Sequence, residues 1–265
     1  MEKIIAQYIT RLKTFKKYYY LLTILVKKDL KKKYKGSFLG ILWSLLNPLL
    51  NMIVITIVFS ELFHSDVKNF PVYLLSGLLL FGFFSSSTTA SMLSVISASH
   101  LINKVYIPKY IITLSSIISN FIFFLISLID LVIIMMATKV TITINLIYAP
   151  IYLILFFVFC CGISLILATI TVFFRDVEHI YGVLTTVLMY SSAVFYPSEI
   201  IPDKYHFLLT FNPVYYFILG FRTVIYSGDS LDPYNMLLCL IFAVISMIVG
   251  IIVFEKNQDK FILYM

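Results

Sequence analysis

The side chains best suited to chemistry in this 265-residue chain are the basic ones near its N-terminus. Residues 1–35 contain eleven lysines and arginines but only two acids, Glu2 and Asp29. Ammonium and guanidinium groups at this density attract anionic lipid headgroups at a membrane surface. The sequence therefore predicts an anion-binding surface at the start of the chain.

Motifs for catalysis are missing from the sequence. It contains no G-x-x-x-x-G-K-[ST] loop, which would hold nucleotide phosphates, and no H-E-x-x-H or G-x-S-x-G pattern. The four histidines are scattered, and the three cysteines (Cys160, Cys161, Cys239) lie inside apolar runs without metal-ligand spacing. We therefore expect no catalytic residue, no metal site and no cofactor in this chain.

One acid, Asp130, lies well inside an apolar run. A lone ionisable side chain at membrane depth is a functional hypothesis by default. A proton relay normally needs further acids or histidines at the same depth, and none is present. The favoured interpretation is that Asp130 bonds to neighbouring hydroxyl groups or faces a wet cavity, with the relay kept as the alternative.

The composition is that of a membrane protein. Hydrophobic residues make up 61% of the chain, charged residues 12%, and the mean hydropathy is +0.99. A globular chain carries about 25% charged residues, roughly twice this share. Several apolar runs exceed the roughly 18 residues that can span a bilayer. The sequence therefore predicts an all-α integral membrane protein and argues against a soluble helical one.

The chain divides into a basic head and a single transmembrane domain, residues 36–265. In the head, 1–35, apolar side chains recur at helical steps (Leu22, Val26 and Leu30) beside a basic face. This pattern favours an amphipathic helix in the cytoplasmic membrane interface; the alternative is a charge cluster that only orients the N-terminus. The six predicted spans are about 36–62, 71–99, 110–137, 147–174, 177–196 and 234–254.

Residues 197–226, between the fifth and sixth spans, form a segment of a different kind. Pro197 stops the fifth span beside the aromatic pair Phe195-Tyr196, and Asn212-Pro213 marks a second turn. Irregular backbone at membrane depth must line a cavity or be covered by protein. We therefore predict short re-entrant helices that form an outer gate.

The charges predict the orientation of the chain. Six spans put both termini on one side, and sixteen of the 20 lysines and arginines lie on that side. The positive-inside rule then places both termini in the cytoplasm and the gate segment outside. This asymmetry explains the formal net charge of +7, so we expect no nucleic-acid partner.

Aromatic and hydroxylated residues leave two alternatives open. The second span carries small and hydroxylated residues from Ser85 to Ser91, which favours close helix packing, with a polar path as the alternative. Aromatic residues make up 17% of the chain and suit interfacial belts, with stacking platforms for sugar rings as the alternative. The candidate pore or gate aromatics are Tyr34, Phe38, Trp43, Phe195, Tyr196 and Tyr215.

A set of short pieces recurs in order along the chain: Lys35-Gly36-Ser37, Leu39-Gly40, Trp43, Asn47-Pro48, Asn103 to Pro108, Phe174 to Glu178, Val194 to Pro197, and Asn212-Pro213. Their order and spacing resemble the membrane subunits of type-2 ATP-binding-cassette exporters, in the branch that exports lipid-linked polysaccharide or teichoic acid. The resemblance covers nearly the whole chain. It departs at Ser192-Ala193-Val194, where the family often has Ser-Pro-Val, and this change is expected to alter the kink before the gate.

The resemblance implies a permease that exports a polymer on undecaprenyl diphosphate, such as O-antigen, lipopolysaccharide or teichoic acid, across the cytoplasmic membrane of a bacterium. It implies a homodimer with a central pore, and two separate ATPase subunits that bind ATP and Mg²⁺, so this chain itself is expected to be no enzyme. The alternatives are an efflux permease of the same family for a small hydrophobic compound, an ion-coupled transporter working alone, and a membrane-embedded enzyme. The short external loops argue against the efflux permease, and the single intramembrane acid argues against the ion-coupled transporter.

The resemblance also implies roles for particular residues, which are listed here by role. A coupling helix seated in the ATPase would contain Asn103, Lys104, Val105, Tyr106, Ile107 and Pro108. The cytoplasmic mouth would contain Lys31, Lys33, Lys35, Arg175, Asp176 and Glu178. We hypothesise that the basic members of this mouth, together with Lys32, attract the lipid diphosphate.

Overall fold

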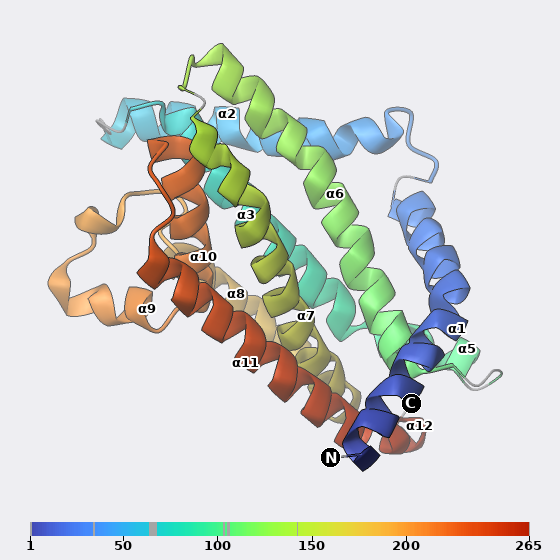
Figure 1. The fold of residues 1–265 in the computed structure, drawn as a ribbon. Coiled ribbons are helices and arrows are strands. Elements are labelled where there is room, and N and C mark those ends of the chain that lie inside the picture. The colour runs from blue at the N-terminus through green and yellow to red at the C-terminus, as the bar shows by residue number, and fades with distance from the viewer. Residues whose placement is uncertain are drawn as a thin grey trace.

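The computed structural model describes residues 2–33, 35–63, 68–102, 104, 107–141 and 143–264, with side chains from Tyr18 to Phe59 and from Lys68 onward. Within these residues the regular elements are helices, and no strand occurs (Figure 1). Five of them are long and apolar enough to cross a membrane, with mean hydropathies between 1.5 and 3.2. The predicted all-α membrane fold is confirmed.

The bundle is built from the four helices α3 (Phe70–Met92), α6 (Lys109–Ala137), α7 (Ala149–Phe173) and α11 (Pro233–Asn257). The helix α2 (Trp43–Phe63) packs along α3 and α6. The short helices α5 (Ser99–Ile102) and α12 (Phe261–Tyr264) lie at one end of the bundle, and α9 (His206–Thr210) and α10 (Pro213–Arg222) lie toward the other (Figure 1).

Proline marks the start of several of these helices, because its missing N–H is not needed in a first turn and its fixed φ suits a helix. The Asn212 side chain accepts a bond from the Val214 N–H at 3.0 Å, and Asp232 accepts one from the Tyr234 N–H at 3.0 Å. These are ordinary N-caps. The prolines in question are Pro71, Pro150, Pro213 and Pro233.

The helix α8 (Val177–Ser191) is shorter than the predicted fifth span, 177–196. Its 15 residues extend about 22 Å, less than the ~30 Å of a hydrocarbon core. The helix ends because Ala193, two residues further on, adopts a left-handed φ of 51°. Its crossing of the membrane remains a prediction, and so does the count of six spans.

A bent pair of helical segments follows α8. Residues 203–210 and 213–227 meet at 91°. The second of these segments contains α10 and a π-helical turn, Thr223–Ser227. If this pair counts as one broken span, the described residues contain up to six candidates. Two short helices therefore lie where the sequence predicts the gate, and their re-entrant placement in a membrane remains a prediction.

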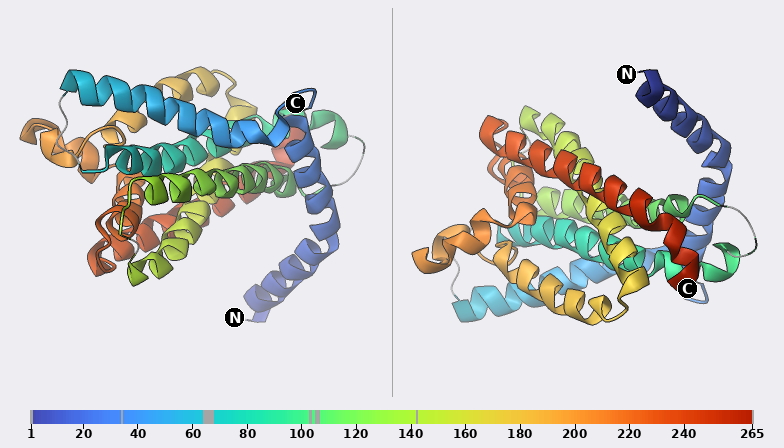
Figure 2. Two further views of the ribbon diagram at one scale, coloured as in Figure 1. Left: turned by 90° about the horizontal axis from the view of Figure 1, so that it is seen from above. Right: turned by 90° about the horizontal axis from the view of Figure 1, so that it is seen from below.

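The N-terminal helix α1 covers Glu2–Lys33 and matches the predicted helical head. Its second half packs on α6, and Leu22, Leu25 and Val26 are buried in one apolar cluster with Ile111 of α6 and Phe261 of α12. The predicted apolar stripe is therefore confirmed at Leu22 and Val26, and the surface that buries it is protein. Figure 2 shows the first half of α1 projecting away from the bundle.

The helices α7 and α11 make the closest packing in the bundle. A Cβ atom on Gly162 would lie 2.2 Å from the Ser246 carbonyl carbon, and one on Gly250 would lie 2.5 Å from the Gly162 oxygen. Small residues permit such backbone contact between membrane helices. The opposite side of the bundle carries α2 and α8, as Figure 2 shows.

Candidate functional site

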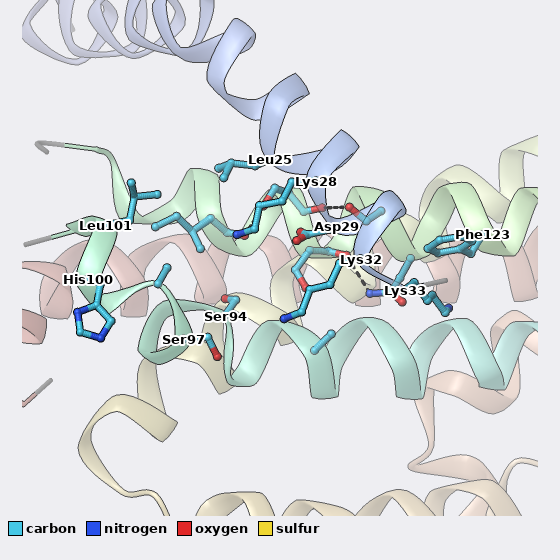
Figure 3. Close-up of a pocket in the computed structure, with 17 residues that line it drawn as sticks. Leu25, Lys28, Asp29, Lys32, Lys33, Ser94, Ser97, His100, Leu101 and Phe123 are labelled. Atoms are coloured by element: carbon cyan, nitrogen blue, oxygen red, sulfur yellow. Dashed lines mark hydrogen bonds between the residues drawn. The ribbon is translucent and has the colours of Figure 1, made fainter. Parts of the chain in front are cut away.

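A cavity of about 520 Å³ opens between the last turns of α1 and the helices α3, α5 and α6 (Figure 3). It also borders α4 (Ser94–Ser97). Its size lies within the range of 300–1,000 Å³ typical of ligand pockets. The polar residues that line it are Lys28, Asp29, Lys32, Lys33, Ser94, Ser97, His100, Ser115, Ser116, Ser119 and Asn120.

The cavity is positively charged, because three lysines from α1 meet one acid. The Lys33 ammonium lies 4.1 Å from the centre of the Phe123 ring, and its partial burial lowers its pKa. Burial raises the pKa of Asp29, although Lys28 and Lys32 act in the opposite direction. The ammonium groups supply several charged donors, so this arrangement suits a phosphate or diphosphate group. The lining hydroxyls that donate to backbone oxygens three or four residues earlier in the chain are those of Ser94, Ser115 and Ser119.

The structure places only one predicted mouth residue, Lys33, on this cavity. Lys31 and Lys35 are exposed near the end of α1 and are not among the lining residues. Arg175, Asp176 and Glu178 are exposed around the turn between α7 and α8, and they also lie outside the lining.

Sequence reasoning missed the serines of α6 that complete the cavity. The spacing of Ser115 and Ser119 could have revealed them, because residues four apart share one face of a helix. Both serines line the cavity together with Ser116. The cavity is therefore a mixed site of lysines and hydroxyl groups, and the predicted cytoplasmic mouth stays a prediction.

The predicted coupling helix is only partly described. Asn103, Val105 and Tyr106 lie outside the described residues. Lys104 is exposed, Ile107 is buried, and Pro108 directly precedes α6. This short connection follows α5, at the end of the bundle that carries the lysine cavity. Its contact with an ATPase remains a prediction.

A second hollow of about 290 Å³ lies between α3 and α8. Ser85 and Thr89 line it from α3, and Thr185 and Thr186 line it from α8. Other members of the same hydroxylated stretch, Ser87, Thr88 and Ser91, are buried in the bundle. The predicted packing role is therefore confirmed for one face of α3, and the hydroxylated residues of another face line this hollow, called here the hydroxyl-lined groove. The polar path stays a prediction.

The C-terminal end of α8 is held by a buried arginine. Arg222 of α10 is 5% exposed and donates from Nη1 to the Ala193 oxygen at 2.7 Å and from Nη2 to the Val194 oxygen at 2.8 Å. It also donates to the Tyr73 oxygen at 2.9 Å and to Ser76 Oγ at 3.4 Å, both in α3. The guanidinium carbon lies 3.6 Å from the centre of the Tyr73 ring.

Asn212 and Tyr73 complete this cluster. The Asn212 amide donates to Ser191 Oγ at 3.1 Å and to Ser192 Oγ at 2.8 Å, so the Asn-Pro piece ties α10 to the end of α8. The Tyr73 hydroxyl donates to the Ala193 oxygen at 3.2 Å and the Tyr196 oxygen at 2.9 Å. These bonds replace the helical donors that the chain loses where α8 ends.

Sequence reasoning counted Arg222 among the outer charges and gave it no role. The available signal was its position in the run Val214 to Tyr226, where it is the only charged residue. The rule applied to Asp130 applies equally here, since an ionisable residue in an apolar membrane segment is a functional candidate. The burial and the bonds of Arg222 support that reading of the sequence.

The candidate aromatics do not form one continuous path. Phe195 is buried and stacks at 6.1 Å on Phe59, while the Tyr196 hydroxyl donates to the Tyr190 oxygen at 2.6 Å. The remaining members are separate, and their role in a pore stays a prediction. Phe38 is fully exposed, Trp43 is partly buried, Tyr215 packs on Tyr216, and Tyr34 lies outside the described residues.

Asp130 does not bond to hydroxyl groups as the favoured interpretation expected. Its side chain is fully buried, and neither carboxylate oxygen has a hydrogen-bond partner within the described part of the chain. The hydroxyl one turn earlier, Ser127 Oγ, donates to the Phe123 and Ser44 oxygens instead. The expected bond between Asp130 and neighbouring hydroxyl groups is therefore wrong.

The chain matches the ABC-2 type transporter family over residues 20–226, and it belongs to that family. It is 31% identical over 243 residues to the O-antigen export system permease protein RfbA of Klebsiella pneumoniae, covering 91% of this chain and 93% of that protein. A protein of the same name from Myxococcus xanthus is 28% identical over 243 residues, covering 91% and 94%. The polysialic acid transport protein KpsM of Escherichia coli is 22% identical over 205 residues, covering 76% and 80%.

Proposed function

We propose that this chain is the permease subunit of an ATP-driven exporter of polysaccharide. The names of its relatives describe O-antigen export and polysialic acid transport, and the likeness extends over most of each chain. The described helices supply a membrane bundle with a hydroxyl-lined groove. Hydroxyl groups suit a sugar chain, because they donate and accept hydrogen bonds as the sugar does. A small hydrophobic cargo would gain little from such a lining.

The finer proposal is that the exported polymer is linked to a lipid diphosphate, as on undecaprenyl diphosphate. The observation that carries it is the cavity of about 520 Å³ where three α1 lysines face the serines of α6. An amphipathic helix in the interface would hold these lysines at headgroup depth, where the diphosphate of a lipid lies. The cavity therefore suits the linker of the substrate, and the groove suits its sugars.

The assembly that we propose contains two copies of this chain and two ATPase subunits. The ATPases would bind ATP and Mg²⁺, and residues 103–108 would contact them from the cytoplasmic end, with both termini on that side of a bacterial cytoplasmic membrane. The helix α8 buries only Tyr181 and Ser191 among its described side chains. We assign the exposed side formed by α2 and α8 to the contact with the second copy.

The lysine cavity is tested by two double variants with the same change in charge. Lys28→Gln/Lys32→Gln removes two lining ammonium groups, whereas Lys31→Gln/Lys35→Gln removes two that lie outside the lining. With the purified transporter in lipid, we expect the first variant to raise the concentration of lipid-linked polymer that half-stimulates ATP hydrolysis by about tenfold or more, since each charge-assisted bond contributes roughly 1.5–3 kcal/mol.

The second variant is the control and should stay close to the parent protein. Equal effects of both variants would mean that general surface charge, and not the cavity, attracts the substrate. Basal ATP hydrolysis without polymer should be unchanged in both, which separates substrate binding from assembly with the ATPase.

A further inference from the structure

One side chain joins three elements at the outer end of the bundle. Arg222 belongs to α10, and its guanidinium contacts both α3 and the irregular segment 192–197 that follows α8. A gate at this end can open only if these elements move relative to one another. The bonds of Arg222 therefore lie where such movement must occur.

The partners of Arg222 are neutral. Within the described residues, the guanidinium bonds to three carbonyl oxygens and one hydroxyl, and no carboxylate is among these partners. An ion pair would fix the arginine to one residue, because separating two buried opposite charges is costly. Carbonyl oxygens are present along every segment, so the arginine can exchange one for another as the segments shift.

The fold leaves room for this guanidinium at Gly77 of α3. A Cβ atom on Gly77 would lie 2.4 Å from Arg222 Nη2 and 3.3 Å from Val194 Cγ1. Any larger residue would push the guanidinium out of its position. The absence of a side chain at Gly77 thus permits the contact of Arg222 with α3, although the two residues are distant in sequence.

The helix α3 reaches from this contact to the other end of the bundle. Its 23 residues extend about 35 Å, and α4, α5 and the proposed coupling residues follow it. The face of α3 that holds Arg222 lies in its first turns, at Tyr73, Ser76 and Gly77. A displacement at the cytoplasmic end of α3 is therefore transmitted to the arginine.

We propose that Arg222 is a positioning residue of the outer gate, which clasps segment 192–197 against α3 and releases it when α3 is displaced in the transport cycle. The gating role rests on the proposed function. The clasp itself is a property of the chain alone. The two can therefore be tested separately.

The test uses Val194→Cys as a reporter. The Val194 side chain is fully buried within the clasped segment, and the native cysteines Cys160, Cys161 and Cys239 are also buried. A membrane-impermeant maleimide, applied to the assembled transporter, should therefore label the reporter slowly at rest. We expect Arg222→Lys, which keeps the charge but loses the forked donors, to increase the labelling rate at least tenfold.

A second variant displaces the arginine without replacing it. Gly77→Ala should expose the reporter to a similar extent, since the added methyl group would lie 2.4 Å from Arg222 Nη2 and the guanidinium must move away. Tyr152→Phe is the matched control, because the Tyr152 hydroxyl is buried without a described partner and its loss should leave labelling unchanged. In the parent protein ATP should accelerate labelling, whereas in Arg222→Lys labelling should be fast with or without ATP.

The outcomes are distinct. A reporter that stays protected in both Arg222→Lys and Gly77→Ala would overturn the clasp, and so would labelling of the native cysteines at the same rate, which would mean that Arg222 only maintains the fold. If the parent transporter exports no polysaccharide, the proposed function fails, but the labelling rates still report on the clasp.

Discussion

At the residue scale, Ala193 determines how the chain leaves α8. Its φ of 51° is left-handed, a conformation that costs a non-glycine residue roughly 1–2 kcal/mol. The conformation is retained because the Ala193 oxygen accepts bonds from both Arg222 and Tyr73. Proline is fixed near φ −65° and cannot form this left-handed turn. The change of kink relative to the family's Ser-Pro-Val stays a prediction, with this physical basis.

This turn predicts opposite results for two substitutions. Ala193→Pro should destabilise the protein by about 2–3 kcal/mol, the scale of a strained backbone that its surroundings no longer support. Ala193→Gly should be neutral or stabilising by up to ~1 kcal/mol, because glycine adopts positive φ freely but gains entropy in the unfolded chain. Thermal unfolding of the purified protein in detergent measures both. A tolerated proline would contradict the left-handed turn.

At the element scale, the pair α7 and α11 depends on backbone contact. Gly162 lies against the backbone of Ser246 and Met247, and Ser246 Oγ donates to the Phe159 oxygen at 3.4 Å. The two helices bury Cys160 and Cys239 in the same core. These helices connect the end of the bundle that carries α10 to the apolar cluster that buries residues of α1 and α12.

The close contact makes even a methyl group disruptive. Gly162→Ala would place its Cβ 2.2 Å from a backbone carbonyl carbon, so the helices must separate, at a cost of about 1–3 kcal/mol. Gly82→Ala is the control, because a Cβ there meets nothing within 4 Å. We expect Gly162→Ala to lower the thermal unfolding temperature in detergent and Gly82→Ala to maintain or raise it. Equal temperatures would exclude the tight pairing.

At the scale of the whole molecule, the lysine cavity and the clasp lie at opposite ends of one bundle. The cavity belongs to the end that carries α5 and the last turns of α1, and the clasp belongs to the end that carries α10. The helix α3 contributes residues to both, and the hydroxyl-lined groove lies along it. A single helix therefore contacts each site that we assign to transport.

The proposed homodimer predicts cross-links on one side of the bundle. Val187 is 50% exposed on α8 and Val249 is 42% exposed on α11. The helix α8 lies on the side of the bundle shared with α2, and α11 lies on the opposite side (Figure 2). In membranes treated with an oxidant, Val187→Cys should form a disulfide-linked dimer, because a residue near a two-fold axis meets its own copy. Val249→Cys should remain monomeric. The reverse pattern would place the second copy against α11.

The sequence alone determined the class of protein, most helix positions and the kind of chemistry. Apolar runs long enough to span a bilayer, with prolines at several starts, predict α6, α7 and α11 closely, because membrane helices satisfy their own backbone and need no distant partner. The predicted second span, 71–99, runs past the end of α3 at Met92, and the predicted first span, 36–62, begins before α2 does at Trp43. The charge count indicated the basic head, and the short motifs indicated the exporter family. These features are local, so the order of residues is enough to predict them.

The tertiary structure decided what depends on residues far apart in the chain. Nothing local to Arg222 shows that it bonds to residue 73 and to residues 193 and 194, and nothing local to Lys28 shows that it faces the serines of α6. The early end of α8 likewise depends on donors from α3 and α10. Both sites exist only because the bundle brings such residues together, and their partners follow from packing.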